Sequence, residues 1–177
     1  MKFIVAVDKA WGIGYKGDLL ARVRGDLKNF RAVTKNKVVV YGSNTLATFP
    51  NGKVLPNRVN IVLNWDVDYH PEGATVVHSL DELFEELKKY DTDDVFVIGG
   101  ASIYRQLIPY CDTGYITVFD KTYESDVKIP DLDASDEWER VSESEVFTSD
   151  PETDTEADLE YVFTVYKKKA STSIVEK

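Results

Sequence analysis

The chain has 177 residues, of which 43% are hydrophobic, and this length and composition fit one globular domain with its own core. Its formal net charge of -10 makes nucleic acid and anionic membranes poor partners, so we expect it to bind neither. The single cysteine, Cys111, excludes an internal disulfide and suits a reducing cytoplasm, which we expect as the location. With only His70 and His78 beside that cysteine, the sequence predicts no metal site.

Short apolar runs rich in β-branched residues recur along the chain and predict buried strands. Such runs are typical of a parallel sheet, whose strands are covered on both faces. Two later stretches alternate apolar and polar residues and predict an antiparallel pair near a sheet edge. The expected parallel strands are Phe3–Val7, Lys37–Tyr41, Val59–Leu63, Thr75–Val77, Val95–Ile98 and Tyr115–Val118, and the antiparallel pair is Arg140–Phe147 and Leu159–Lys167.

Helical patterns lie between these strands. The clearest has an apolar face and begins after Ser79, which forms a capping box with Glu82. Alternation of strands and helices predicts an α/β domain over residues 1–169, with a mostly parallel central β-sheet of about eight strands, an antiparallel C-terminal strand and helices on both faces. The expected helices are about Asp26 to Val33, a short one after Gly42, Leu80–Tyr90, and one from near Ala101 that ends before Pro109.

Two segments of the C-terminal part carry no predicted helix or strand. The acidic run Ser149–Asp158 separates the last two strands, and like-charge runs usually face water, so we expect a solvated hairpin loop. The last residues, 170–177, are expected to form a loose tail, as chain ends often do.

Asp26 is the first candidate functional residue. It begins a helix and lies four residues before Phe30, so the two side chains share one side of that helix. An ordinary first-turn acid, favoured by the helix dipole, would look the same. The functional alternative is a carboxylate beside an aromatic ring, at the mouth of an apolar pocket, which could hold a flat, nitrogen-rich ring through a bidentate charge-assisted pair.

Three further segments could bind anionic groups. Gly99-Gly100 ends a buried strand and opens a helix, where backbone can approach a phosphate, but the full dinucleotide fingerprint is missing. Tyr41 and Gly42 close another strand in the same way. Arg58 directly precedes a predicted strand, and its guanidinium could bind a ligand carboxylate through two hydrogen bonds. Plain turns and a surface arginine are the alternatives at these three places.

The order and spacing of these segments are more specific than any one of them. Over residues 1–169 the chain resembles dihydrofolate reductase. The resemblance depends on Ala6-Val7-Asp8, Trp11-Gly12-Ile13-Gly14, Gly25-Asp26-Leu27-Lys28-Asn29-Phe30, Val40-Tyr41-Gly42-Ser43-Asn44-Thr45, Leu55-Pro56-Asn57-Arg58, Val97-Ile98-Gly99-Gly100-Ala101-Ser102-Ile103-Tyr104, Tyr115-Ile116-Thr117 and Ile129-Pro130.

The resemblance implies NADPH-dependent hydride transfer to 7,8-dihydrofolate, which gives tetrahydrofolate for one-carbon and thymidylate metabolism, by an enzyme expected to be a monomer. Asp26 would bond the amidine edge of the pterin ring, Thr117 would support its carboxylate, and Tyr104 would lie beside the nicotinamide. Arg58 would hold the glutamate α-carboxylate of the substrate. The other implied substrate-binding positions are Ile4, Ala6, Leu27, Phe30, Arg31, Phe49, Lys53, Leu55 and Ile98.

The same resemblance implies how the cofactor is held. Gly99 and Gly100 would be joined by the cis peptide bond of the family, and Gly14–Val23 would be a mobile loop that closes over the nicotinamide. The implied cofactor-binding positions are Ala6, Ile13, Gly14, Gly42, Ser43, Asn44, Thr45, Asn64, His78, Gly99, Gly100, Ala101, Ser102, Ile103 and Tyr104.

The chain departs from the family pattern at the mobile loop and at the ribose phosphate. Leu19-Leu20-Ala21 stands where the family usually has Leu-Pro-Trp. Ser43, Asn44 and Ser102 stand where basic residues are common, so NADH is an alternative cofactor. Two other functions stay open: the related pyrimidine reductase of riboflavin synthesis, and a folate- or nucleotide-binding protein without turnover.

Overall fold

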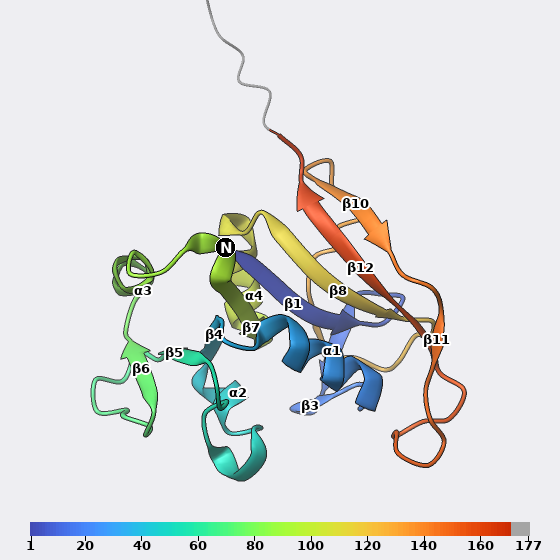
Figure 1. Ribbon diagram of the computed structural model, residues 1–177, viewed down its shortest axis with the longest axis horizontal. Coiled ribbons are helices and arrows are strands. Elements are labelled where there is room, and N and C mark those ends of the chain that lie inside the picture. The colour runs from blue at the N-terminus through green and yellow to red at the C-terminus, as the bar shows by residue number, and fades with distance from the viewer. Residues whose placement is uncertain (171–177) are drawn as a thin grey trace, which may run out of the picture.

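The computed structural model in Figure 1 describes residues 1–170, so the predicted tail 170–177 lies outside the described residues except for Ala170. A nine-stranded sheet with the order β10-β12-β8-β1-β7-β4-β5-β6, to which β11 adds by pairing with β12, forms the centre of the molecule. Its strands are β1 (Lys2–Val7), β4 (Val38–Gly42), β5 (Val59–Leu63), β6 (Ala74–Val77), β7 (Val95–Gly99), β8 (Thr113–Phe119), β10 (Trp138–Glu143), β11 (Phe147–Thr148) and β12 (Glu160–Lys168).

The pairing confirms the predicted α/β class. Strands β8, β1, β7, β4, β5 and β6 pair in parallel, whereas β12 is antiparallel to β8, β10 and β11. The prediction of one strand over Arg140–Phe147 is wrong, because the segment is divided into the end of β10 and the start of β11. The register of β10 shifts between Arg140 and Ser142, and Ser144 leaves the ladder to bond Phe163 with both its N–H and its hydroxyl.

A second, three-stranded sheet was not predicted. It has the order β3-β2-β9, with β2 (Gly12–Tyr15), β3 (Asp18–Leu19) and β9 (Val127–Lys128). Lys16 and Gly17 connect β2 to β3, and both have positive φ, of 49° and 80°. A two-residue connection with two positive φ values suits the right-handed twist of a hairpin. Part of the predicted mobile loop is therefore a β-hairpin in this structure.

Four helices accompany the main sheet in the described residues: α1 (Arg24–Thr34), α2 (Ser43–Leu46), α3 (Leu80–Leu87) and α4 (Ala101–Leu107). Helix α1 begins two residues before the predicted start at Asp26. Only one of the two bonds of the predicted capping box of α3 forms. The Ser79 hydroxyl accepts from Glu82 N at 3.1 Å, but the Glu82 carboxylate accepts from His78 N instead of Ser79 N. None of the helices within residues 1–170 is long and apolar enough to cross a membrane.

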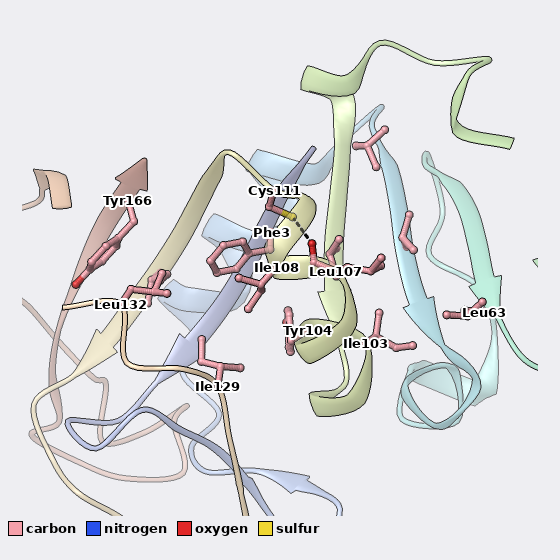
Figure 2. Packing of buried hydrophobic residues seen from close by; sticks show 14 of the residues in the cluster. Phe3, Leu63, Ile103, Tyr104, Leu107, Ile108, Cys111, Ile129, Leu132 and Tyr166 are labelled. Carbon is pink, nitrogen blue, oxygen red and sulfur yellow. Dashed lines mark hydrogen bonds between the residues drawn. The ribbon is translucent and has the colours of Figure 1, made fainter. Parts of the chain in front are cut away.

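Side chains of the inner strands alternate between two buried clusters, one on each face of the sheet. The first cluster joins Phe3, Val40 and Val97 to Leu83 of α3 and to the buried side of α4. Figure 2 shows part of it, including Tyr104 and Leu107. The second cluster joins the intervening strand residues Ile4, Val39, Tyr41, Phe96 and Ile98 to Leu46 of α2 and to the apolar side of α1. Helices therefore cover both faces, as predicted.

Candidate active site

The predicted site residues gather where the parallel strands end. Strands β1, β7 and β4 are neighbours in the sheet and parallel, so their carboxyl ends meet at one edge. Pairing between β1 and β7 stops at Phe3↔Val97, whereas β1 stays paired with β8 as far as Val7↔Val118. The main chain of Ile4 is thus free of the ladder on the β7 side, and its carbonyl accepts a hydrogen bond of 2.7 Å from the Tyr104 hydroxyl.

Asp26 lies in the first turn of α1 and turns its carboxylate toward the sheet. The Thr117 hydroxyl on β8 donates to its Oδ1 at 2.7 Å. Burial raises the pKa of Asp26 from its ordinary value of 3.8 to about 6, and the hydrogen bond from Thr117 opposes part of this rise. A half-buried acid that titrates near neutral pH can be an anion or a proton-carrying group under working conditions.

Apolar predicted substrate residues share one wall beside this carboxylate. The second cluster contains Ile4 and Ile98, and Phe30, Phe49 and Leu55 pack against it. The Phe49 ring meets the Tyr41 ring edge-on, at 5.1 Å between centroids. Leu27 is half-buried on α1. Ala6 instead packs against a third cluster (Ala21, Val23, Phe119, Leu159 and Tyr161), so it lies at one side of this wall.

Arg58 is half-buried and held in place by its own neighbourhood. Its Nε donates to the Thr34 hydroxyl at 2.9 Å, its NH1 donates to the Pro56 carbonyl at 2.7 Å, and the guanidinium lies 5.9 Å from the centre of the Phe30 ring. Burial lowers the pKa of Arg58, and the adjacent positive charge of Arg31 lowers it further. A guanidinium held beside the Phe30 ring, with the charge of the exposed Arg31 nearby, suits a carboxylate ligand.

Lys53 was predicted to bind substrate together with Arg58, but within the described part of the chain its side chain is not bonded to the other predicted substrate residues. Its side chain is exposed, and within residues 1–170 no hydrogen bond or ion pair connects its ammonium group to another side chain.

Asn60 is a buried residue that the sequence analysis missed. Its Oδ1 accepts from the Tyr41 hydroxyl at 2.9 Å and from Leu55 N at 3.1 Å, and its Nδ2 donates to the carbonyls of Leu55 and Arg58. One amide therefore fixes both the loop that carries Arg58 and the end of β4. A polar residue inside the apolar strand run Val59–Leu63 was the available signal, since buried polar groups require partners.

Two glycine-ended strands meet at the predicted phosphate positions. A Cβ at Gly42 would lie 3.1 Å from Ile103 Cγ1, and one at Gly100 would lie 3.5 Å from Thr45 Oγ1. The turn after β4 and the turn after β7 therefore pack against each other. Gly99 has a φ of 123°, and the predicted cis peptide bond between Gly99 and Gly100 is confirmed. Helices α2 and α4 have only four and seven residues, so backbone N–H groups matter here more than a helix dipole.

The remaining predicted cofactor residues flank these turns. His78 Nδ1 lies 2.8 Å from the Asn64 carbonyl, which joins the ends of β5 and β6. Ser102 and Asn44 are exposed at the starts of α4 and α2, where Ser43 and Ala101 are half-buried. Ile13 and Gly14 lie on β2, in the small sheet.

The predicted solvated hairpin loop Ser149–Asp158 is confirmed, because it connects the antiparallel strands β11 and β12 and most of its residues are exposed. The sequence analysis did not predict how firmly this loop is held. Ser149 is buried, and its hydroxyl bonds the Glu156 carbonyl and Leu159 N. The Glu156 carboxylate accepts from Lys121 and Tyr123. The Asp154 carboxylate accepts from Arg24 N, at the start of α1. Long-range contacts of this kind leave no mark in the local sequence pattern.

The fold and the site define an α/β protein with candidate phosphate-binding turns at the carboxyl ends of the parallel strands β4 and β7, and with Arg58 just before β5. A family model for dihydrofolate reductase matches residues 1–168. The chain is 35% identical over 171 residues to a dihydrofolate reductase of Bacillus subtilis (strain 168), with 97% of this chain and 96% of the relative covered. It is 30% identical over 142 residues to that of Staphylococcus haemolyticus, with 80% and 82% covered.

A solved structure is similar over almost the same range. Dihydrofolate reductase from Enterococcus faecalis, complexed with NADP(H) and RAB-propyl, superposes with a TM-score of 0.79 and 32% sequence identity, covering 96% of each chain. The chain belongs to the dihydrofolate reductase family, whose members are NADPH-dependent oxidoreductases. The comparisons thus favour the reductase over a pyrimidine reductase and over a binding protein without turnover.

Proposed function

We propose that this chain reduces 7,8-dihydrofolate to tetrahydrofolate with a hydride from NADPH, at the site built around Asp26. The observation that carries the proposal is the Asp26–Thr117 pair, in which a half-buried carboxylate with a pKa raised to about 6 faces the apolar wall of Ile4, Phe30 and Ile98. A flat ring with an amidine edge fits such a carboxylate, because two N–H groups can donate to its two oxygens.

The substrate roles follow from this placement. Asp26 binds the amidine edge of the pterin ring, and Thr117 keeps the carboxylate oriented. Leu27, Phe30, Phe49 and Leu55 pack against the pterin and aminobenzoyl rings, with Ile4, Ala6 and Ile98 at the strand ends. Arg58 binds the α-carboxylate of the glutamate, and the nearby Arg31 charge adds to the attraction. Lys53, whose side chain is exposed, contributes only a distant charge in this arrangement.

The residues at the two glycine turns fit the cofactor. A side chain at Gly42 or Gly100 would fill the space where Ile103 and Thr45 approach, so both turns leave bare backbone. We assign the phosphates of NADPH to the backbone of Gly42–Thr45 and Gly99–Ile103. Asn64 and His78 are assigned to the adenosine end, and Ala6, Ile13, Gly14 and Tyr104 to the nicotinamide end. NADPH supplies the hydride when it is bound at this site.

The protein orients the pterin ring and favours its protonation. The imine carbon of the pterin accepts the hydride and the adjacent nitrogen accepts a proton from water, so the carbon–nitrogen double bond becomes single. Asp26, as an anion at the amidine edge, raises the proton affinity of that nitrogen and orders water near it. Tyr104 stays neutral, because burial and the Asp26 charge raise the pKa of its phenol, and its hydroxyl fixes the Ile4 carbonyl.

The setting of the enzyme is also part of the proposal. One domain over residues 1–169, acting as a monomer in the cytoplasm, suits a chain whose one cysteine is buried. The net charge of -10 supports a function without nucleic acid.

An absorbance assay tests the proposal directly. The near-ultraviolet absorbance of NADPH should fall, one cofactor for each dihydrofolate, when the purified chain is added. Asp26→Asn should abolish most of this rate, whereas Glu139→Gln, which removes an exposed acid on β10, should leave it unchanged. Binding of both molecules without loss of absorbance would refute the proposal. Michaelis constants measured with NADPH and with NADH decide the cofactor preference.

A further inference from the structure

The N-terminus of α1 lacks a cap from its own segment. The residue at the N-cap position is Val23, whose side chain cannot accept a hydrogen bond. The first backbone bond of the helix runs from Leu27 N to the Val23 carbonyl at 3.0 Å. The N–H groups of Arg24, Gly25 and Asp26 therefore precede the helical ladder and need other partners.

Asp154 supplies one of these partners from a distant part of the chain. Its Oδ1 accepts from Arg24 N at 2.8 Å, and its Oδ2 accepts from Asp150 N at 2.7 Å. A carboxylate at this point also meets the positive end of the helix dipole. In agreement with these bonds, the pKa of Asp154 is lowered: burial raises it, but the hydrogen bonds from Arg24 and Asp150 outweigh that effect.

Two neighbouring contacts hold the same junction. Arg22 N donates to the Thr155 hydroxyl at 3.0 Å, and Thr155 N donates to the Arg22 carbonyl at 3.2 Å. A side chain at Gly25 would collide with the Tyr161 hydroxyl, so the first turn of α1 lies directly on β12. Asp154, Thr155 and Tyr161 therefore contact three of the four residues 22–25 that lead to Asp26.

The loop that carries Asp154 is itself fixed to the sheet. Ser149 bonds across its base to Glu156 and Leu159, and Glu156 bonds Lys121 and Tyr123. Strand β12 pairs with β8 through Tyr161↔Phe119 and Phe163↔Thr117. The strand pair that seats the start of α1 therefore also carries Thr117, the hydrogen-bond partner of Asp26.

We propose that Asp154 is a positioning residue for Asp26: its carboxylate caps α1 from the loop 149–158 and so determines where Asp26 lies against Thr117. The inference rests on the proposed function of Asp26 in binding the pterin ring. In most helices a residue at the N-cap position accepts the capping hydrogen bond, whereas here a residue of a distant loop accepts it. The inference also gives a physical reason for a short side chain with an oxygen at position 154, because that oxygen must reach the Arg24 N–H.

Four variants separate the geometry of the cap from its charge. Asp154→Ala removes both. Asp154→Asn keeps an oxygen for the Arg24 N–H without the charge, and its amide nitrogen replaces the oxygen that accepts from Asp150 N. Asp154→Glu keeps the charge but displaces it by one methylene. Glu152→Ala removes an equal charge from the exposed part of the same loop and is the matched control. Single-turnover hydride transfer and the Michaelis constants for dihydrofolate and NADPH are measured for each.

Variants that lose the hydrogen bond to Arg24 N should be impaired, and variants that keep it should stay close to wild type. Losing a cap changes the local equilibrium by a factor of roughly 2 to 30, so Asp154→Ala should slow hydride transfer about three- to tenfold and raise the Michaelis constant for dihydrofolate by a similar factor. The Michaelis constant for NADPH should not change. Asp154→Glu should resemble Asp154→Ala, and Asp154→Asn should stay much closer to wild type than either, because it keeps the bond to Arg24 and loses only the bond from Asp150 N. General unfolding would instead lower the active fraction and leave both Michaelis constants unchanged.

Two outcomes would overturn the inference. In the first, Asp154→Ala changes hydride transfer and the Michaelis constant for dihydrofolate no more than Glu152→Ala does. In the second, Asp154→Glu is normal while Asp154→Asn is impaired, because the charge would then matter and the cap would not. If Asp154→Ala does not fold, the Asn and Glu variants carry the test alone.

Amide exchange keeps this inference separate from the proposed function. Exchange of the Arg24 N–H, which Asp154 binds, and of the Leu27 N–H, which makes the first bond of the helix, should accelerate in Asp154→Ala and Asp154→Glu and stay slow in Asp154→Asn and Glu152→Ala. This readout needs no turnover. If the wild-type chain consumed no NADPH but the exchange followed this pattern, the cap would stand and the proposed reaction would fail.

Discussion

Replacing Asp26 by asparagine should stabilise the protein at alkaline pH while it removes most of the activity. The carboxyl group has a pKa of about 6 in the folded protein and an ordinary value of 3.8, because burial disfavours its anion. The difference is about 2 pKa units, which corresponds to roughly 3 kcal/mol of unfavourable free energy when the group is fully ionised. An asparagine amide lacks this cost, and its oxygen can still accept the Thr117 hydroxyl.

The pH dependence has a definite sign. The folded pKa is raised, so the unfolded chain ionises first as pH rises, and the contribution of Asp26 to stability is present below pH 3.8 and lost by the time pH passes 6. From these two values, the destabilisation is about 1 kcal/mol near pH 4.5 and about 3 kcal/mol near pH 8. The stability gain of Asp26→Asn over wild type should therefore grow by about 2 kcal/mol between these conditions.

Urea unfolding at both pH values measures this double difference. Subtracting wild type from variant at each pH cancels the titration of every other group that the substitution leaves unchanged. Glu139→Gln, which changes an exposed acid, should show no such growth. A stability difference for Asp26→Asn that is equal at the two pH values would show that the carboxyl group titrates normally, and would refute the raised pKa of Asp26.

Further predictions concern the groups around Asp26. In wild type, kcat/KM for dihydrofolate should fall as pH drops below about 6, because Asp26 binds the amidine edge as an anion. Thr117→Val should move this break upward, because the Thr117 hydroxyl holds the pKa of Asp26 down; a break at unchanged pH contradicts the role of Thr117. Arg58→Gln should raise the Michaelis constant for dihydrofolate about 10- to 100-fold, while a dihydropterin without glutamate is unaffected; equal losses for both would exclude a carboxylate contact. Asn60→Ala should lower the free energy of unfolding by about 3 kcal/mol in urea, since it leaves the buried Tyr41 hydroxyl and three partly buried backbone groups without this partner; a loss under 1 kcal/mol would show that water replaces the amide.

The sequence by itself determined the main elements of the fold. Successive residues of β1, β4 and β7 point to opposite faces of the sheet, and most of them are apolar. A mostly parallel sheet covered by helices on both faces buries both sets of side chains. Ser79 marked the start of α3 because capping is a local interaction. The positions of Asp26, Gly42 and Gly99 were also found from local pattern, because strand ends and helix starts have their own sequence signals.

Only the tertiary structure decided which of these positions work together. Thr117 meets Asp26 across 91 residues of sequence, and Asp154 meets Arg24 across 130. The small sheet, the division between β10 and β11 and the amide network of Asn60 likewise depend on neighbours far away in the chain. A local pattern records the preference of a residue for water or for the core, but a buried polar atom takes whichever partner the packed chain brings to it. The pKa of Asp26 and the cap on its helix are therefore properties of the folded molecule.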